Sequence, residues 1–218
     1  DLRGLPFGQN PKTGDTRISG SLASLVGLEH ALETGDNKAI NDSIKLILLL
    51  HGMILSFGGI PLLYYGDEIG TLNDDSYRDD PHKIGDTRWV HRPSIDWEKA
   101  GRRNVPGTVE FEIFIALKRM AAVRKEINVF ADFNNRELIE VENPHLFVFG
   151  RYHLQQSNEQ VLVVANFSEK PQHLNLEDLG SWQTQYRSLV DLYSGESPDI
   201  FKKSLVIPGY SFYWLSER

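Results

Sequence analysis

The chain has 218 residues, with 23 Lys and Arg against 30 Asp and Glu, and a formal net charge of −7. A surface of this sign repels phosphate backbones and anionic lipid headgroups, which argues against a general role in binding nucleic acid or a membrane surface. With 40% hydrophobic and 24% charged residues, the composition is that of a globular chain and excludes intrinsic disorder. The apolar run Leu46–Leu50 is bounded by Lys45 and His51, far short of the roughly 18 residues that a membrane span requires.

The sequence contains no cysteine. Disulfides, thiolate metal sites and thiol nucleophiles are therefore excluded, which fits a reducing compartment and favours a cytoplasmic location, with secretion as the alternative. The chain begins at Asp1 without an initiator Met or an apolar leader. We therefore expect it to be a piece of a longer polypeptide.

The first part of the chain predicts two helices and a buried strand. Apolar residues at helical spacing predict a helix that begins after the N-cap Ser21 and stops near Gly35. A wider apolar surface predicts a second, mostly buried helix over residues 38–56. The run Ile60–Tyr65 is apolar without alternation, which is typical of a parallel strand buried on both faces. Helix, glycine turn, buried strand and acidic loop together form one unit of a barrel or doubly wound sheet.

The middle of the chain predicts a functional loop and a third helix. Residues 69–106 are rich in Asn, Asp, Arg, Gly and Pro without periodicity, and a loop of this length in a compact protein is usually functional. Apolar residues at helical spacing then predict a helix over residues 108–127 with Thr108 as its N-cap.

After Asn128 the apolar period changes from about 3.6 to 2, which predicts antiparallel strands. The expected strands are Leu138–Val141, Leu146–Phe149, Val161–Phe167, Gln185–Tyr193, Ser204–Ile207 and Tyr210–Leu215, with turn residues such as Asn143–Pro144, Ser157–Asn158 and Pro208–Gly209 between them. The predicted fold class is therefore α/β plus all-β. We expect a boundary near residue 128, with residues 1–128 in the first domain and residues 129–218 in the second.

Several acidic residues are candidates for a catalytic site or a metal site. Asp67 and Glu68 are adjacent, and adjacent strand residues point to opposite faces, so the pair cannot flank one bond. Either one carboxylate faces a site beyond the strand end, or both bond backbone and Arg. The 73–80 loop, which holds four Asp residues, could be read as a calcium loop. No frame supplies Gly at the sixth and Glu at the twelfth position, which favours a solvated loop without metal.

The positions of these histidines do not indicate a catalytic triad or a zinc site. His51 stands on an apolar helix and fits a core or helix-interface group better than a base, whereas His82 and His91 lack a carboxylate or Ser at motif spacing. Arg88 beside Trp89 can pair with a buried carboxylate while the ring limits a pocket. From spacing alone, a surface ion pair is the default interpretation for Arg88.

A set of motifs resembles one known family. The motifs are Pro6-Phe7 with Asn10-Pro11, Thr13-Gly14-Asp15, Arg17-Ile18-Ser19-Gly20, Gly59-Ile60-Pro61-Leu62, Tyr64 with Gly66-Asp67-Glu68, Gly70-Thr71-Leu72-Asn73-Asp74-Asp75, and Arg88-Trp89 with His91-Arg92-Pro93. Together they resemble the C-terminal portion of an amylosucrase over most of residues 3–125. The buried-strand motif alone indicates only the wider α-amylase superfamily, and the Gly70–Asp75 and Arg88–Pro93 strings narrow the resemblance to sucrose-acting members.

The resemblance implies the C-terminal part of a (β/α)₈ barrel followed by an antiparallel β-sandwich. It also implies that the catalytic nucleophile, the acid/base Glu and the stabilising Asp lie upstream of Asp1, on the remainder of the barrel. The chain itself then carries no catalytic residue and no cofactor, and we expect it to be inactive alone, because retaining chemistry needs two carboxyl groups about 5 Å apart.

The resemblance assigns substrate recognition to three residues. Arg88 matches an Arg that pairs with an upstream Asp at the floor of the glucosyl pocket. Arg17 matches an Arg on the acceptor side that helps to hold the growing glucan, and Asn10 matches an Asn nearby. The family usually has a Gln two residues before that Asn, where this chain has Gly8.

The expected function is that of an amylosucrase-like retaining glucosyltransferase, which cleaves sucrose, releases fructose and passes glucose to an α-1,4-glucan. The expected partners are sucrose and the glucan acceptor. One alternative is a sucrose hydrolase or another glycosidase of the same superfamily, which the missing Gln at position 8 favours. An alternative of another class is a non-catalytic carbohydrate-binding or structural module.

Overall fold

The computed structural model describes residues 3–153, 159–182 and 188–217. These residues divide into two compact units, the first comprising residues up to Ile47 with Leu63–Ile115 and the second comprising Leu48–Leu62 with residues from Ala116 onward. Each of the two long helices therefore contributes one part to each unit. The domain boundary near residue 128 stays a prediction.

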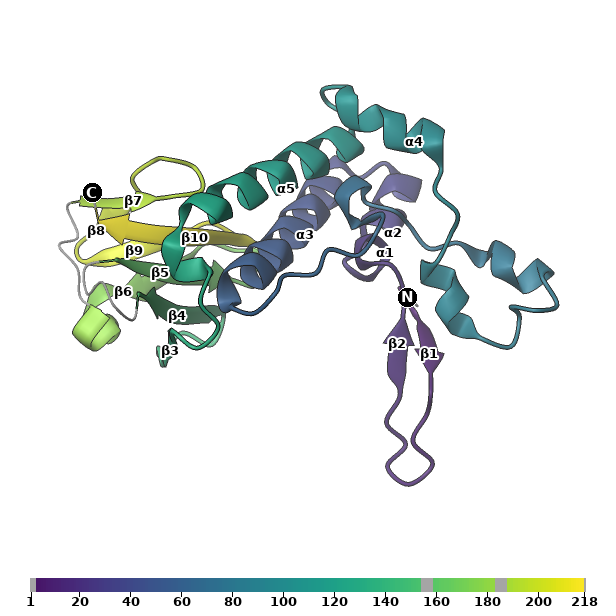
Figure 1. Ribbon diagram of the computed structural model, residues 1–218, viewed down its shortest axis with the longest axis horizontal. Helices are drawn as coiled ribbons and strands as arrows, with labels where there is room; N and C mark the ends of the chain where they lie inside the picture. The colour runs from purple at the N-terminus through teal and green to yellow at the C-terminus, as the bar shows by residue number, and fades with distance from the viewer. Residues whose placement is uncertain (1–2, 154–158, 183–187, 218) are drawn as a thin grey trace. The chain divides into compact units, whose positions relative to one another are not determined.

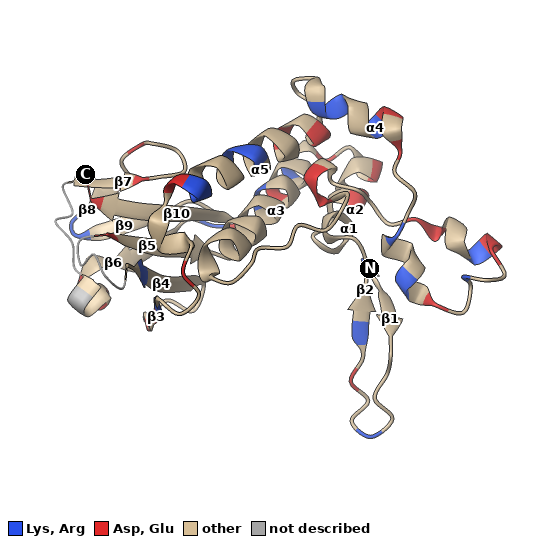
Figure 2. Cartoon of the chain, in the orientation of Figure 1, with Lys and Arg blue, Asp and Glu red and all other residues tan. Residues whose placement is uncertain are grey.

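The first unit opens with the antiparallel hairpin of β1 (Leu5–Phe7) and β2 (Arg17–Ser19), visible in Figure 1 below the N-terminus. Seven short helical elements lie elsewhere in this unit, within its described residues. In chain order they are α1 (Leu22–Leu25), α2 (Leu28–Thr34), η1 (Asp67–Ile69), η2 (Asp75–Asp79), η3 (Thr87–His91), α4 (Trp97–Gly101) and η4 (Arg102–Asn104). Figure 2 shows that charged residues are frequent over the long segment that follows η1.

The helix predicted to follow Ser21 is interrupted in the structure. Ser21 is the N-cap of α1, as expected, and its hydroxyl accepts from the Ser24 N–H at 3.3 Å. Gly27, at φ 98°, separates α1 from α2. A residue in the left-handed conformation cannot continue a right-handed helix. The apolar residues keep the helical spacing that predicted one helix, but the chain forms two short helices.

Both long helices are confirmed close to their predicted bounds. They are α3 (Asn37–Phe57) and α5 (Val109–Glu126). The Thr108 hydroxyl accepts from the Phe111 N–H at 3.2 Å, which makes it the predicted cap of α5. One 18-residue window of α3 has a mean hydropathy of 1.4, so α3 meets the length and composition of a membrane span, a test that core helices of soluble proteins also pass.

The buried strand predicted at Ile60–Tyr65 is wrong for this structure, which has no strand between α3 and η1 among its described residues. Ile60 is 86% exposed and Leu62 is 79% exposed. A parallel strand forms only between neighbours that supply its hydrogen bonds, and no strand of the described residues pairs with this segment. The barrel implied by the resemblance accordingly stays a prediction.

The second unit confirms the antiparallel β region. Its five-stranded sheet has the order β3-β4-β5-β10-β7 and its three-stranded sheet the order β6-β9-β8. The strands are β3 (Arg136–Ile139), β4 (Leu146–Tyr152), β5 (Gln160–Asn166), β6 (Gln172–Asn175), β7 (Leu189–Asp191), β8 (Ile200–Phe201), β9 (Ser204–Ile207) and β10 (Ser211–Glu217), with η5 (Asn128–Phe130) before them and η6 (Leu176–Trp182) after β6. The strand predicted over 185–193 is described only from Ser188 onward, and the predicted turn at Ser157–Asn158 lies outside the described residues.

The two sheets share a core that contains Leu146 and Val164 from the larger sheet and Leu205 and Ile207 from the smaller one. This packing is that of a β-sandwich. The opposite face of the larger sheet is covered as well, because Phe57 of α3 contacts Phe149 edge to face with ring centroids 5.4 Å apart. Residues on both faces of β5 are therefore buried, which explains its continuous apolar sequence.

Three arginines donate to the last carbonyl groups of α3, where the helix dipole is negative. The Arg124 Nε donates to the Leu55 carbonyl at 2.7 Å, and the Arg136 Nη1 donates to the Phe57 carbonyl at 3.3 Å. The Arg151 Nη1 donates to the carbonyl of Ser56. The helix end is thus bound by side chains of α5, β3 and β4.

Arg151 is fully buried and has carbonyl partners in place of a carboxylate. Its guanidinium donates to Asn135 Oδ1 and to the carbonyls of Val129 and Asp132, at 2.8 Å and 2.6 Å for the last two. Burial, together with the neighbouring guanidinium groups, lowers the pKa of Arg151 to about 10. The side chain is therefore still charged at neutral pH and requires every one of these acceptors.

Candidate functional site

The residues predicted to recognise substrate all lie in the first unit, around the β1–β2 hairpin and η3. Asp86 is the N-cap of η3, and its carboxylate accepts from the Arg88 N–H at 3.0 Å. The Thr87 hydroxyl donates to the Pro6 carbonyl at 3.0 Å, which ties η3 to β1. The helix cap thus orders the loop that carries Arg88, and the Thr87 side chain bonds this loop to the hairpin.

Arg88 forms a two-pronged pair with Asp86. Its Nε lies 2.8 Å and its Nη2 2.6 Å from the Asp86 carboxylate oxygens. The side chains are 44% and 28% exposed, so solvent screens this pair. The hydrogen bonds from Arg88 lower the pKa of Asp86 to about 2. Within the described residues Arg88 therefore pairs with its own cap, and its pairing with an upstream Asp stays a prediction.

Phe7 connects Arg88 with Arg17. The Arg88 guanidinium carbon lies 4.6 Å from the centroid of the Phe7 ring, a distance typical of a cation–π contact. Arg17 is the cross-strand partner of Phe7, and directly opposed residues in an antiparallel pair present side chains on one face. The structure therefore places Arg88 on the Phe7 ring and Arg17 directly across the strand pair from Phe7.

Asn10 lies in the loop that closes the hairpin. Its side-chain Oδ1 accepts from the Lys12 N–H at 2.9 Å, and its backbone N–H donates to the Asp15 carbonyl at 2.7 Å. Gly8, in the same loop, has φ 59°. That left-handed conformation favours glycine at position 8.

Aromatic side chains surround the rest of the loop that carries Arg88. The Lys83 Nζ lies 5.2 Å and the Arg92 guanidinium carbon 5.7 Å from the centroid of the Trp89 ring. His91 contacts the Tyr64 ring at 6.1 Å between centroids. Burial, followed by the charge of Arg92, lowers the pKa of His91, so the imidazole is neutral at pH 7. Aromatic faces and guanidinium groups on one loop suit the recognition of a polyhydroxylated ligand.

The acidic candidates have local structural roles. Glu68 accepts from the Gly66 N–H at 2.7 Å, which fits the reading in which these carboxylates bond backbone. In the 73–80 loop, Asp74 accepts from the Ser76 N–H and Asp75 pairs with Arg78, each at 2.9 Å. No group of three or more His, Asp or Glu residues suited to a metal ion occurs in the described part of the chain.

Two contributors to this site were not predicted from the sequence. Asp86 is the partner of Arg88, and the Asp-x-Arg spacing of a capped turn is the signal that could have identified it. Phe7 was noted only as part of a motif, because its role depends on the pairing of two very short strands.

Comparison with known proteins gives a match for the second unit. Residues 136–214 match the family model for the maltogenic amylase C-terminal domain. The trehalose synthase/amylase TreS of Mycobacterium tuberculosis is 30% identical over 190 residues, which cover 77% of this chain and 31% of that protein. The chain therefore spans about a third of the length of this curated relative.

Solved structures give the same fold. The pullulanase from Anoxybacillus sp. LM18-11 superposes with a TM-score of 0.59 at 14% identity, covering 92% of this chain and 26% of the pullulanase, and it has also been solved in complex with maltotriose. A trehalulose synthase mutant superposes with a TM-score of 0.53 at 18% identity, covering 79% of this chain and 38% of that one. The structural neighbours are enzymes of the α-amylase superfamily, and the β region has the fold of their C-terminal domain.

Proposed function

We propose that this chain is the C-terminal portion of a retaining α-amylase-superfamily enzyme that cleaves sucrose and transfers glucose to an α-1,4-glucan, as amylosucrases do. The observation that carries the proposal is the contact of Arg88 with the Phe7 ring, opposite which Arg17 lies in the strand pair; all three residues belong to the motifs that resemble amylosucrase. The similarity to trehalose synthase, trehalulose synthase and pullulanase supports chemistry at α-glucosidic bonds.

In this proposal the chain supplies binding and the upstream polypeptide supplies catalysis. The nucleophile, the acid/base and the stabilising carboxylate lie on the preceding barrel strands, because retaining chemistry needs two carboxyl groups about 5 Å apart across the anomeric carbon. Arg88 closes the glucosyl pocket so that only a terminal glucose fits. Arg17 and Asn10 hold the acceptor glucan by hydrogen bonds to its hydroxyl groups.

A second candidate is hydrolysis of sucrose on the same scaffold. Transfer and hydrolysis share the covalent glucosyl-enzyme intermediate, and water attacks this intermediate more often when the glucan acceptor binds weakly. Gly8 favours this candidate, because no side chain extends from that position toward an acceptor. A non-catalytic carbohydrate-binding module is the third reading, and it predicts glucan binding without turnover.

The test uses the longer polypeptide that contains this chain. With sucrose and added maltooligosaccharide, we expect fructose release together with glucan growth, and we expect neither from the 218-residue chain alone. Arg17→Met should shift the product ratio toward free glucose by up to about tenfold, since a lost charged hydrogen bond weakens acceptor binding by that order. Lys12→Met, a change of the same charge in the same loop, is the control.

Three results would contradict parts of this proposal. Fructose release from the 218-residue chain would show that the catalytic groups are not upstream. Release of free glucose without glucan synthesis, at a rate that Arg17→Met does not change, would favour the sucrose hydrolase. Glucan retention without any sucrose turnover by the longer polypeptide would favour the binding module.

A further inference from the structure

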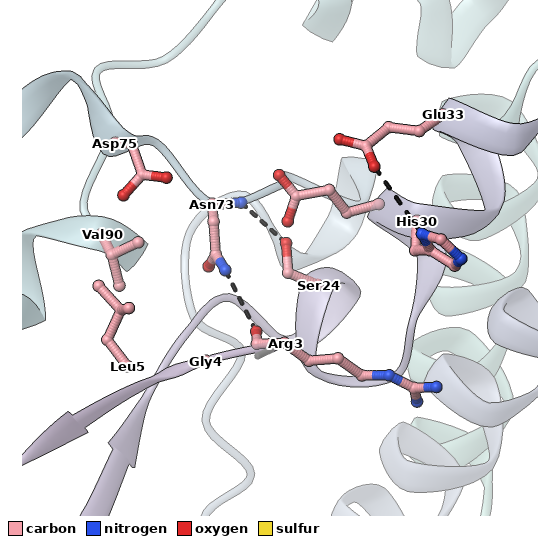
Figure 3. A pocket seen from close by; sticks show the side chains of 10 residues that line it. Arg3, Gly4, Leu5, Ser24, His30, Glu33, Asn73, Asp75 and Val90 are labelled. Atoms are coloured by element: carbon pink, nitrogen blue, oxygen red, sulfur yellow. Dashed lines mark hydrogen bonds and ion pairs between the residues drawn. The ribbon is translucent and has the colours of Figure 1, made fainter. Parts of the chain in front are cut away.

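A hollow of about 240 Å³ lies at the base of the β1–β2 hairpin, on the side away from the closing loop. Figure 3 shows the side chains of Leu5, Val90 and Asp75 on one side, and those of Arg3, His30 and Glu33 on the other. Glu29 also lines it. The cavity thus has two apolar side chains with one carboxylate beside them, opposite a wall of planar polar groups.

Asn73 fixes the frame of this hollow. Its Oδ1 accepts from the Ser21 N–H at 2.8 Å, its Nδ2 donates to the Arg3 carbonyl at 3.2 Å, and its N–H donates to the Ser24 Oγ at 2.9 Å. Segments from the chain start, from α1 and from the long loop therefore converge on one amide side chain. The site is built before any ligand arrives, which reduces the entropy lost on binding.

The charges of the lining select a class of ligand. Asp75 is paired with Arg78, and the carboxylates of Glu29 and Glu33 outnumber the cationic Arg3, so a phosphate or another anion is repelled. A metal ion is disfavoured as well, because the described residues contain no group suited to one and Arg3 adds like-charge repulsion. A neutral ligand rich in hydroxyl groups satisfies carboxylates as acceptors and a guanidinium as donor.

Size and shape narrow the class further. Pockets for drug-sized ligands occupy about 300–1,000 Å³, so this hollow suits a single ring. A pyranose presents C–H groups on one face and hydroxyl groups at its edge, which matches Leu5 and Val90 opposite the polar wall. The nearest ion pair in that wall, His30 Nδ1 to Glu33, is long at 3.9 Å and well exposed, so both groups can turn toward a ligand.

We propose that this hollow binds one glucosyl unit of an α-glucan, as a subsite separate from Arg88 and Arg17. The choice of glucose rests on the proposed function, whereas the binding of a neutral pyranoside rests on the hollow alone. The subsite would hold a remote glucosyl unit of a longer glucan at the base of the hairpin while its reacting end lies elsewhere.

The experiment measures maltose binding to the 218-residue chain by NMR titration. We expect weak saturable binding, with the ring signals of His30 among those that shift. Glu29→Gln should raise the Kd at least fivefold, because the amide loses the charge that strengthens hydrogen bonds from sugar hydroxyls. Glu112→Gln, an exposed change of the same kind on α5, should leave the Kd unchanged. Far-UV circular dichroism checks that each variant is folded.

Each contrary outcome is informative. Absence of maltose binding to the folded chain, or binding that Glu29→Gln does not weaken, would overturn the subsite. Calcium binding in place of maltose binding would overturn it in favour of a cation site. If maltose binds as predicted but the longer polypeptide releases no fructose from sucrose, the subsite stands and the proposed function fails.

Discussion

Replacing Arg151 by Met tests whether the buried guanidinium holds the second unit together. The substitution removes the donor for the Ser56 and Asp132 carbonyls and for Asn135 Oδ1. Each buried acceptor left without a partner costs about 1–3 kcal/mol, and the recovered desolvation of the guanidinium offsets part of that sum. We therefore expect the free energy of unfolding to fall by about 3 kcal/mol, a large share of the about 5–15 kcal/mol that holds a domain folded.

The assay is urea denaturation at pH 7 followed by tryptophan fluorescence, since Trp214 packs on Phe130, the ring beneath the Arg151 guanidinium. Arg151→Lys should lose about half as much stability, because an ammonium keeps the charge but lacks the planar fork. Lys118→Met is a control of the same charge change at an exposed position. A loss for Arg151→Met no larger than that of Lys118→Met would refute the reasoning.

Three further predictions concern other features. The pKa of Asp86 is lowered from 3.8 to about 2, so the folded chain favours the ionised carboxylate. The ion pair with Arg88 should therefore be complete above pH 3.8 and should be lost as the pH falls through about 2. Carboxyl NMR should show that midpoint, and a midpoint that Arg88→Met leaves unchanged would exclude the pair as the cause of the lowered pKa. Gly150→Ala should destabilise the second unit by about 1–3 kcal/mol, because the added Cβ would meet the Trp182 ring at 2.1 Å; an unchanged urea midpoint would show that the ring has room to move. Ile60→Lys should change the stability of the isolated chain by less than about 0.5 kcal/mol, as at an exposed position, and a loss of several kcal/mol would restore the buried-strand interpretation.

The sequence predicted those elements whose signals are local. The caps Ser21 and Thr108 were identified because an N-cap hydroxyl bonds a backbone N–H only three residues ahead. The strand Ser204–Ile207 was predicted with its observed bounds, since alternation and a following Pro-Gly turn define it. By contrast, β6 was missed because Leu174 is its only large apolar residue.

Features that depend on distant partners could not be predicted in the same way. Ile60–Tyr65 has the composition of a buried strand, but a strand exists only where neighbours supply hydrogen bonds. Arg151 interrupts an apolar strand, and its burial depends on carbonyl acceptors at the end of α3, which is distant in sequence. At the candidate site, the motifs identified Arg88 and Arg17, whereas the contact of Arg88 with Phe7 and the pairing of Phe7 with Arg17 depend on how the chain folds.

The double covering of the larger sheet has a consequence for how this region can be exchanged between enzymes. The stretch 136–214 that matches the family model leaves out Phe57 and Phe130, whose rings lie against Phe149 and Trp214. A graft limited to that stretch would present a bare aromatic surface to solvent and invite aggregation. Recombination between relatives should therefore succeed only when the last turns of α3 and the segment from Ala116 are transferred together with the strands. The transferable unit is thus discontinuous in sequence.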